Sequence, residues 1–261
     1  PEKSFVALVD KASAVQSVIN ITYPIVLKPG TPDVIKTRVL NQVLGGGSSA
    51  RLFVNLREDK GFTYGAYSSI SSDKLVGEFS AGASVRNEVT DSAIVEFNHE
   101  LNRLRNEEIS DEELNLAISS ISGSFARSLE RPQTVASFAI NTARYNLPAD
   151  YYSTYLKRVQ AINVADVQQT AEKFIHPDKA YITVVGKPSD VAKKLEAFGD
   201  VRYFDTYGNE YVPSDSPNMP AGQTAEKVID ACLTAIGGKE KLSSIKDLTI
   251  ESNANIQGQP L

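Results

Sequence analysis

The chain has 261 residues, of which 41% are hydrophobic and 23% are charged, proportions that are ordinary for a globular protein. Its net charge is −5 with acidic and basic residues interspersed, so no basic stripe indicates a nucleic-acid interface. No apolar run approaches the ~18–20 residues of a transmembrane helix, and no signal-like segment opens the sequence. Because the sequence starts at Pro1 without an initiator methionine, we expect a piece of a longer protein. The single cysteine, Cys232, excludes an internal disulfide, which suits a cytoplasmic protein and equally a large envelope protein.

Two strands and a helix are expected at the start of the chain. Residues 3–10 and 14–25 are rich in β-branched side chains that partly alternate with polar ones, which is typical of strands. A helix should then follow Thr31, whose hydroxyl is a suitable N-cap, with Pro32 at the first helical position. The glycine triplet 45–47 should end this helix.

A short helix and a hairpin are expected next. Residues 49–59 predict the helix, and Gly61 permits the turn that ends it. Residues 62–71 and 75–85 predict two antiparallel strands.

Helices dominate the middle of the chain. Apolar residues between 89 and 104 recur on one helical face, and Ser110 with Glu113 forms a capping-box pattern before a second helix. Asn163 is a suitable N-cap for a later helix. Further helices are expected at 134–145, 150–159, 164–175 and 189–199, and strands at 180–186 and 201–205.

This order of hairpins, helices and a strand–helix–strand unit predicts an α+β fold. In such a fold an antiparallel sheet is covered by helices on one face. We expect residues 1–210 to form one domain and the segment 211–223, rich in Pro, Gly and Ser, to be a linker. Residues 224–261 are too few to bury a core easily, so they are interpreted as the truncated start of a further domain.

The glycine-rich segment formally matches a dinucleotide-binding pattern. The letters GGGSSA from Gly45 fit G-x-G-x-x-A, but that fingerprint must follow a strand and open a helix. Here a helix precedes the glycines, and no Lys-Ser/Thr pair follows in the register of a P-loop. A helix end and turn is the better interpretation of this segment.

The chain has few groups for metal chemistry. His99 has no partner ligand at helical spacing, and His176 stands at a helix end before Pro177. Neither H-E-x-x-H nor H-x-x-E-H is present. We therefore expect both histidines to be structural, and the chain alone to bind no stoichiometric zinc and to cleave no peptide.

Several separated motifs, in the same order, resemble the second domain of the pitrilysin-type zinc peptidases. They are AVQSVI, then VLNQVLGGGSSARLFVNLREDKGFTYGAYSS, then NVADVQQTAEKFIHPDKAYITVVGKPSDV. The resemblance covers about residues 3–210 and points to a bacterial member, for which the periplasm or cell envelope is favoured over the cytoplasm. The tail from Thr224 resembles, more weakly, a lipoprotein-carrier-like module.

The resemblance implies a role for two residues. An Arg and a Tyr, seven positions apart, project from this half of the family's enzymes into the active chamber, and they match Arg57 and Tyr64 here. Zinc is bound in the other half, which carries H-x-x-E-H and which this chain lacks. The resemblance thus implies a substrate-binding half without a cofactor of its own. Its partners would be a peptide and a zinc-bearing domain, in the same chain or in a separate subunit.

The chemistry of the pair is consistent with that role. Attack on a peptide carbonyl builds negative charge on its oxygen, and a phenol donor such as that of Tyr64 would stabilise this charge in the transition state. Arg57 offers five donors in a fork, which could hold a substrate carbonyl or polarise Tyr64. Phe62 shares a strand face with Tyr64 by parity whereas Tyr67 does not, so Phe62 is a second candidate for lining the chamber.

Alternatives remain open from the residues alone. Arg57 could be a solvated charge at a helix end, Tyr64 could be a core residue, and Glu58 is better read as an ion-pair partner of Arg57 than as a base. Two other functions are carried forward: a catalytically inactive scaffold of the same fold, as in the core subunits of the respiratory cytochrome bc1 complex, and a cofactor-binding enzyme that uses the glycine loop.

Overall fold

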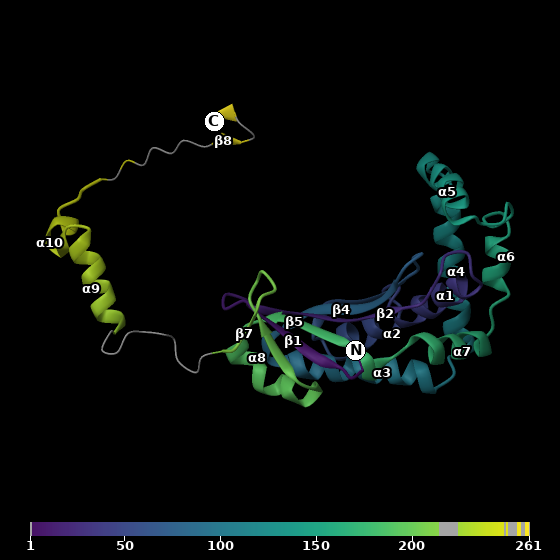
Figure 1. Ribbon diagram of the computed structural model, residues 1–261, viewed down its shortest axis with the longest axis horizontal. Helices are drawn as coiled ribbons and strands as arrows, with labels where there is room; N and C mark the ends of the chain where they lie inside the picture. The colour runs from purple at the N-terminus through teal and green to yellow at the C-terminus, as the bar shows by residue number, and fades with distance from the viewer. Residues whose placement is uncertain (1, 214–223, 248, 250–254, 257–258, 261) are drawn as a thin grey trace. The chain divides into compact units, whose positions relative to one another are not determined.

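The computed structural model describes residues 2–213, 224–247, 249, 255–256 and 259–260 (Figure 1). The chain divides into two compact units, Pro1–Val212 and Pro213–Leu261. Each unit is described by itself below.

The first unit is built on one seven-stranded sheet with the order β3-β4-β2-β5-β1-β6-β7. The strands are β1 (Phe5–Asp10), β2 (Gln16–Ile25), β3 (Thr63–Ser71), β4 (Gly77–Arg86), β5 (Tyr181–Gly186), β6 (Val201–Phe204) and β7 (Glu210–Tyr211). The α-helices are α1 (Asp33–Leu44), α2 (Arg51–Phe53), α3 (Thr90–Asn106), α4 (Asp111–Ser128), α5 (Pro132–Tyr145), α6 (Tyr155–Gln160), α7 (Val164–Phe174) and α8 (Pro188–Leu195). A π-helix, η1 (Val54–Asp59), continues α2, and three short 3₁₀ turns are η2 (Asn87–Val89), η3 (Pro177–Lys179) and η4 (Glu196–Phe198).

The predicted α+β class is confirmed, and the sheet is mixed. Neighbouring strands from β3 through β4 and β2 to β5 pair antiparallel, as do β6 and β7. Strand β1 instead pairs in parallel with both β5 and β6. The antiparallel pattern therefore does not extend to β1. Strands β5 and β6 lie on either side of β1 and each follows a helix, α7 or α8, which is the kind of crossover connection that parallel pairing requires.

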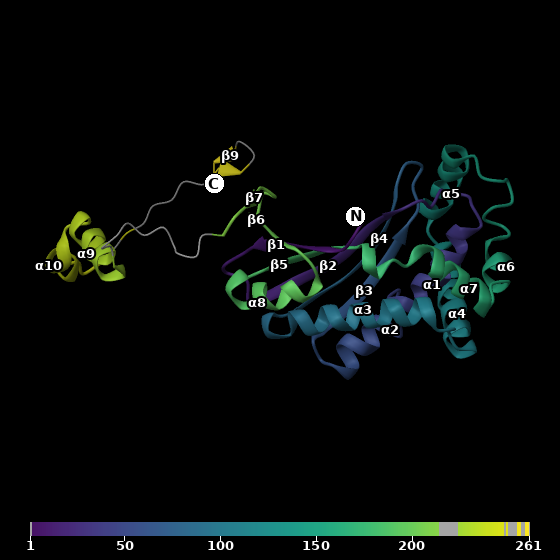
Figure 2. The same ribbon diagram turned by 60° about the horizontal axis from the view of Figure 1, so that its bottom comes forward.

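Helices cover one face of the sheet, as predicted (Figures 1 and 2). In β2, Ile19, Ile21 and Tyr23 are buried, while the alternating residues Val18 and Asn20 are exposed. This alternation is typical of a sheet with one packed face and one open face. Long helix α3 contributes the fully buried Phe97, Leu101 and Leu104 to the packed layer. Burying each such side chain contributes about 1.5–3 kcal/mol.

Two of the three predicted helix caps are observed. Ser110 with Glu113, and Asn163 with Asp166, form complete capping boxes at the starts of α4 and α7. Thr31 is not a cap, because α1 begins after Pro32 and the Thr31 hydroxyl donates to the Lys28 carbonyl instead.

The second unit contains α9 (Ala225–Ala235), α10 (Gly238–Ser243) and the short strands β8 (Asn255–Ile256) and β9 (Gln259–Pro260). Tyr211, predicted to begin a linker, instead pairs with Tyr203 in the sheet and donates its hydroxyl to Asp10 at 2.9 Å. Val212 and Pro213 have no regular secondary structure, and residues 214–223 of the predicted linker lie outside the described residues. The assignment of residues 224–261 to a further, truncated domain stays a prediction.

Candidate functional site

The turn between Arg57 and Tyr64 begins with an irregular helix. Over η1 the backbone forms a π-helix, in which the Lys60 N–H donates to the Asn55 carbonyl at 3.0 Å. Gly61, with φ +61°, closes this helix as predicted, and the Phe62 N–H donates back to the Leu56 carbonyl at 2.9 Å. The π-helix is rare in proteins, and where a single turn of it occurs, that turn is often at a functional site. Arg57 lies in this turn.

The same turn ends in an irregular strand. The register of β3 against β4 shifts between Thr63 and Ala66, which is a β-bulge. The Thr63 hydroxyl holds the bulge, because it donates to the Ser84 carbonyl at 2.7 Å and accepts from the Gly65 N–H at 3.1 Å. Bulges often re-aim a side chain next to an active site. Tyr64 lies within this bulge and is 88% exposed.

Arg57 lies against an aromatic platform. Its guanidinium carbon is 4.8 Å from the centre of the Phe53 ring, and its Nε is 3.4 Å from a carboxylate oxygen of Glu58. The predicted ion pair with Glu58 is therefore present. Phe53 is buried and also contacts the ring of Tyr67 at 5.7 Å. Nearly half of the Arg57 side chain remains exposed, so its other donors are available to a ligand.

Arg57 and Tyr64 flank one turn, and among the described residues their side chains form no contact with one another. Both side chains reach solvent, and the Tyr64 hydroxyl has no hydrogen-bond partner within the described part of the chain. Phe62 differs from Tyr64, because it is half-buried and packs against the hydrophobic core. Phe62 precedes β3, which begins at Thr63, so strand parity does not relate Phe62 to Tyr64. A chamber role for Phe62 stays a prediction.

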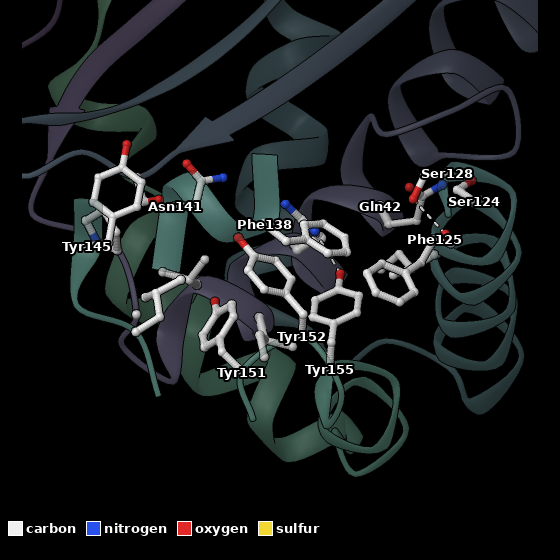
Figure 3. Close-up of a pocket in the computed structure, with 18 residues that line it drawn as sticks. Gln42, Ser124, Phe125, Ser128, Phe138, Asn141, Tyr145, Tyr151, Tyr152 and Tyr155 are labelled. Carbon is white, nitrogen blue, oxygen red and sulfur yellow. Dashed lines mark hydrogen bonds between the residues drawn. The ribbon is translucent and has the colours of Figure 1, made fainter. Parts of the chain in front are cut away.

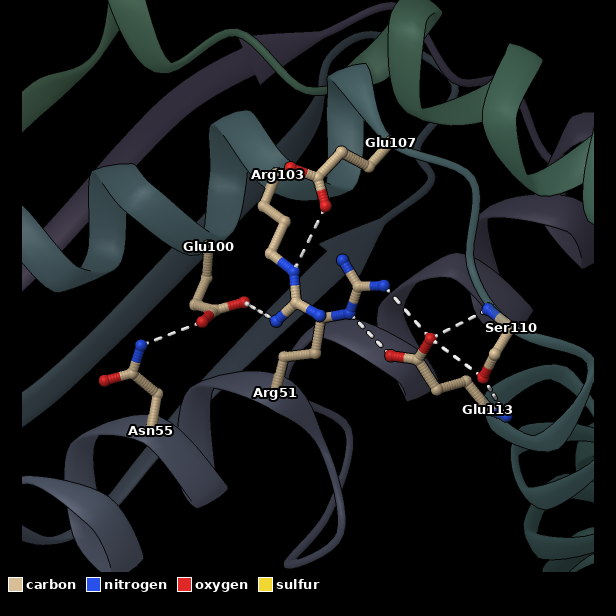
Figure 4. Close-up of polar contacts among 7 residues, drawn as sticks. All are labelled: Arg51, Asn55, Glu100, Arg103, Glu107, Ser110 and Glu113. Atoms are coloured by element: carbon tan, nitrogen blue, oxygen red, sulfur yellow. Dashed lines mark hydrogen bonds and ion pairs between the residues drawn. The ribbon is translucent and has the colours of Figure 1, made fainter.

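Buried polar contacts fix the π-helix from below. The Asn55 amide donates to Glu96 at 3.0 Å and to Glu100 at 2.8 Å, both on α3 (Figure 4 shows the contact with Glu100). Lys60 pairs with Glu96 at 3.0 Å. Burial alone would raise the pKa of Glu96, but hydrogen bonds from Lys60 and Asn55 outweigh it and lower the pKa. Sequence reasoning missed these residues, although a glutamate at position 100, within the apolar stripe of α3, was a detectable signal.

A second buried contact fixes the start of the same segment. Arg51, only 8% exposed, donates from Nε and Nη2 to the two carboxylate oxygens of Glu113 at 2.6 and 3.1 Å (Figure 4). The hydrogen bonds from Arg51, helped by the backbone of Ser110, lower the pKa of Glu113 to about 2. Both ends of the segment that carries Arg57 are thus anchored to the helix layer.

The glycine segment is explained by packing. The Ser68 N–H donates to the Gly45 carbonyl at 3.0 Å, and a Cβ on Gly45 would lie 2.4 Å from the Ser68 nitrogen. A side chain at position 45 would therefore push α1 away from β3. The turn needs no phosphate to account for its first glycine.

The described residues do not fit a zinc ion. Among them there is no group of three His, Cys, Asp or Glu side chains that could hold a metal. His99 is exposed on α3, and His176 lies 3.3 Å from Arg105, where burial and then the arginine charge lower its pKa. Of the helices that the structure describes, none is long and apolar enough to cross a membrane.

The geometry can be compared with known proteins. Residues 1–121 match the family described as the peptidase M16 inactive domain. Over 92 residues the chain is 34% identical to an uncharacterized zinc protease of Streptomyces coelicolor, a match that covers 35% of this chain and 20% of that protein.

Two solved structures show the likeness of the fold. A peptidase M16 inactive domain from Pseudomonas fluorescens aligns with a TM-score of 0.66 at 24% identity, covering 72% of this chain and 44% of that one. A chain of complex III2 from Candida albicans aligns with a TM-score of 0.60 at 16% identity, covering 76% and 49%. The matched region thus spans a fifth of the curated relative and less than half of these structures. Over residues 1–121, the chain is thus similar to the peptidase M16 inactive domain, and the solved inactive domain shares the fold of its first unit.

Proposed function

We propose that this chain is the substrate-binding half of a zinc-dependent peptidase. In this role Arg57 and Tyr64 would bind a peptide and stabilise the tetrahedral intermediate of its hydrolysis. The zinc would be supplied by an H-x-x-E-H domain that lies outside this chain. The observation that carries the proposal is the pair of irregular elements, a π-helix and a β-bulge, that present Arg57 and Tyr64 on either side of one anchored turn.

The exposure of Tyr64 supports this role. A tyrosine that is 88% exposed contributes little to the core, so its position on a bulge held by Thr63 needs another reason. A phenol hydroxyl aimed at the oxygen that gains charge lowers the barrier, because it binds the transition state more strongly than the substrate. Tyr64 has the exposure that a group acting on a bound peptide requires.

Arg57 would contribute by positioning the peptide. Its contact with Phe53 fixes the plane of the guanidinium, and the ion pair with Glu58 occupies only Nε. The remaining donors can hold a backbone carbonyl of the peptide in register. The anchoring of Asn55 and Arg51 to α3 and α4 then limits how far the guanidinium can move.

The test is an enzyme assembled from this chain and a zinc-bearing domain. Tyr64→Phe should lower kcat by about 10²–10³, the usual loss for one oxyanion donor, and should leave the melting temperature unchanged. Tyr207→Phe is the control, because Tyr207 is 90% exposed in the β6–β7 connection and loses the same hydroxyl. Arg57→Lys keeps the charge but loses the fork, so it should raise KM more than it lowers kcat. Near-normal turnover in both variants, beside an active zinc domain, would contradict the proposal.

An inactive scaffold is the second candidate function. It is favoured by the likeness to a chain of complex III2, which shows the fold alone at 16% identity. A scaffold would not require Tyr64 to be exposed on a bulge that hydrogen bonds of Thr63 stabilise, and this argues against the second candidate. If the assembled enzyme were active and indifferent to both substitutions, the scaffold function would be preferred.

A further inference from the structure

A cavity of 570 Å³ in the first unit has an aromatic wall (Figure 3). The ring of Phe138 on α5 stacks on Tyr152 with centroids 3.8 Å apart and on Phe125 of α4 at 5.8 Å. Tyr155 and Tyr151 extend the row at its two ends, at 4.6 Å from Phe125 and 5.1 Å from Tyr152. Such a volume and lining are typical of a site for an apolar ligand group.

Part of this wall is not covered by the protein. Helix α5 has no fully buried residue, and Phe125, Phe138 and Tyr152 are only half-buried. Tyr151 and Tyr155 behind them are buried, so the row has a fixed base. The half-buried rings offer a planar apolar surface that an aromatic side chain could cover.

A second cavity leads from this wall toward Arg57. It has a volume of 460 Å³ and shares Val34, Arg38, Gln42 and Ser72 with the first. It runs along residues 67–72 of β3 and the loop after it, beside the edge of the sheet. At its other end Tyr67 contacts the ring of Phe53, and the guanidinium of Arg57 lies over that same ring. At about 3.3 Å per residue, an extended segment of five or six residues would span this groove.

The charge of the two cavities is positive. Arg38 is the single charged residue among the described residues that line either cavity, and its Nη1 donates to the Tyr155 hydroxyl at 2.8 Å. Two further cations lie over rings that line the first cavity: Lys74 is 5.5 Å from the centre of Tyr145, and Arg158 is 4.3 Å from that of Tyr151. No acidic side chain lines either cavity within the described chain. An anionic group beside the aromatic wall would therefore be attracted rather than repelled.

We propose that the aromatic cavity binds an aromatic side chain of an extended peptide, and that Arg38 pairs with an acidic residue next to it. The proposal rests on the proposed function, since the groove along β3 would lead such a peptide toward Arg57 and Tyr64. It names the substrate class more closely: peptides with an aromatic–acidic pair several residues from the bond that is cut. A peptide is favoured over a small aromatic compound because the second cavity continues the site along a strand edge.

The test measures binding to the full chain without catalysis. Fluorescein-labelled decapeptides of Ser and Gly, with a central Phe-Asp, Ala-Asp or Phe-Asn pair, are titrated with the protein by anisotropy. Replacing Phe by Ala should weaken binding about tenfold or more, as expected for an aromatic side chain that is largely buried. Replacing Asp by Asn should weaken binding a few-fold at low salt and by less at high salt, because an exposed ion pair is screened.

Protein variants locate the site. Phe138→Ala should weaken the Phe-Asp peptide about tenfold, whereas Ile140→Ala should not, because Ile140 lies on the same helix, is 62% exposed and does not line the cavity. Arg38→Gln should make the Phe-Asp and Phe-Asn peptides bind equally. Circular dichroism melts of each variant separate loss of binding from loss of fold, and Phe138→Leu provides a milder change at the same position.

Three results would overturn the proposal. They are equal binding of the Phe and Ala peptides, an equal loss from Phe138→Ala and Ile140→Ala, and binding of N-acetylphenylalanine amide as tight as that of the decapeptide. Because no peptide bond is cut in these titrations, their failure would leave the turnover test of Tyr64 untouched. A failure of Tyr64→Phe to lower turnover would likewise leave the binding result standing.

Discussion

Two parts of the first unit differ in which side chains they expose and in how firmly they are packed. The segment from Arg51 to Tyr64 exposes a few polar groups and is fixed by buried ion pairs and hydrogen bonds beneath it. The arm formed by α5 and the turn before α6 instead leaves the rings of Phe138 and Tyr152 only half-buried, and α5 has no fully buried residue.

The difference shows what each region is suited to do. Transition-state stabilisation needs donors placed within a fraction of an ångström, and buried polar anchors supply that rigidity. Binding of varied side chains needs an apolar surface that can adjust, and a lightly packed helix supplies it. The predictions below test whether the segment is rigid and whether α5 is free, from the largest expected effect to the smallest.

Arg51→Ala should destabilise the protein by about 3 kcal/mol. The change removes two hydrogen bonds at 2.6 and 3.1 Å and leaves the partly buried Glu113 carboxylate without its cation. Urea denaturation followed by circular dichroism measures this. Lys187→Ala is the control, because its pair with Asp190 at 3.4 Å is exposed and should be worth less than about 0.5 kcal/mol. Equal losses in the two variants would show that Arg51 is no anchor.

Gly45→Ala should cost about 2 kcal/mol, and Gly47→Ala should cost much less. A Cβ at position 45 meets the backbone of β3 at 2.4 Å, whereas at position 47 it meets only the flexible end of Gln42 at 3.3 Å. Both substitutions lie in the same glycine triplet, so the pair separates close packing from loop flexibility. Similar melting temperatures for the two variants would contradict the packing explanation.

Asn55→Ala should cost about 1–2 kcal/mol, because Glu100 is 3% exposed and would lose a donor. In the assembled enzyme it should also lower kcat/KM, and this second loss should vanish in an Arg57→Ala background if Asn55 acts by positioning Arg57. Asn102→Ala is the control, since Asn102 is exposed on α3 and its side chain donates to the Asn98 carbonyl within the same helix. Additive losses with Arg57→Ala would reduce Asn55 to a structural role.

Acid should weaken the same anchor. The pKa of Glu113 is lowered to about 2 in the folded chain, so an unfolded chain with an ordinary glutamate pKa near 4.5 takes up the proton first. The contribution of Glu113 is therefore complete above pH ~4.5 and is lost as the pH falls from there toward 2. The difference in unfolding free energy between wild type and Glu113→Gln isolates it from the other carboxylates. A difference that stays constant over that window would contradict the low pKa.

Much of this architecture could be predicted from the sequence, because local signals set it. The capping boxes at Ser110 and Asn163 start α4 and α7, and Gly61 ends the π-helix as expected. The bulge could not be predicted, since it depends on pairing with β4. The parallel pairing of β1 is likewise a long-range choice that no local pattern encodes.

The candidate site was predicted from two exposed residues, and the buried residues beneath it were missed. Arg57 and Tyr64 were chosen from the family's motif, and their functional role stays a prediction. Asn55 and Glu96 carry no motif, because their role depends on η1 meeting α3 forty-one residues later in the chain. The aromatic wall was missed for the same reason: Phe125, Phe138 and Tyr152 come from separate segments and meet only in the folded chain.

The smallest effect is expected on the outer face of α5. Ile140→Ser should change the unfolding free energy by less than about 0.5 kcal/mol, because Ile140 is 62% exposed. Ile94→Val on α3 removes one methyl group from a fully buried side chain and should still cost about 1 kcal/mol. Hydrogen exchange should agree, since amides of α5 should open locally and exchange well before those of α3. A loss above about 1.5 kcal/mol for Ile140→Ser would mean that α5 is firmly packed. The contrast between a rigid segment and a free arm would then fail.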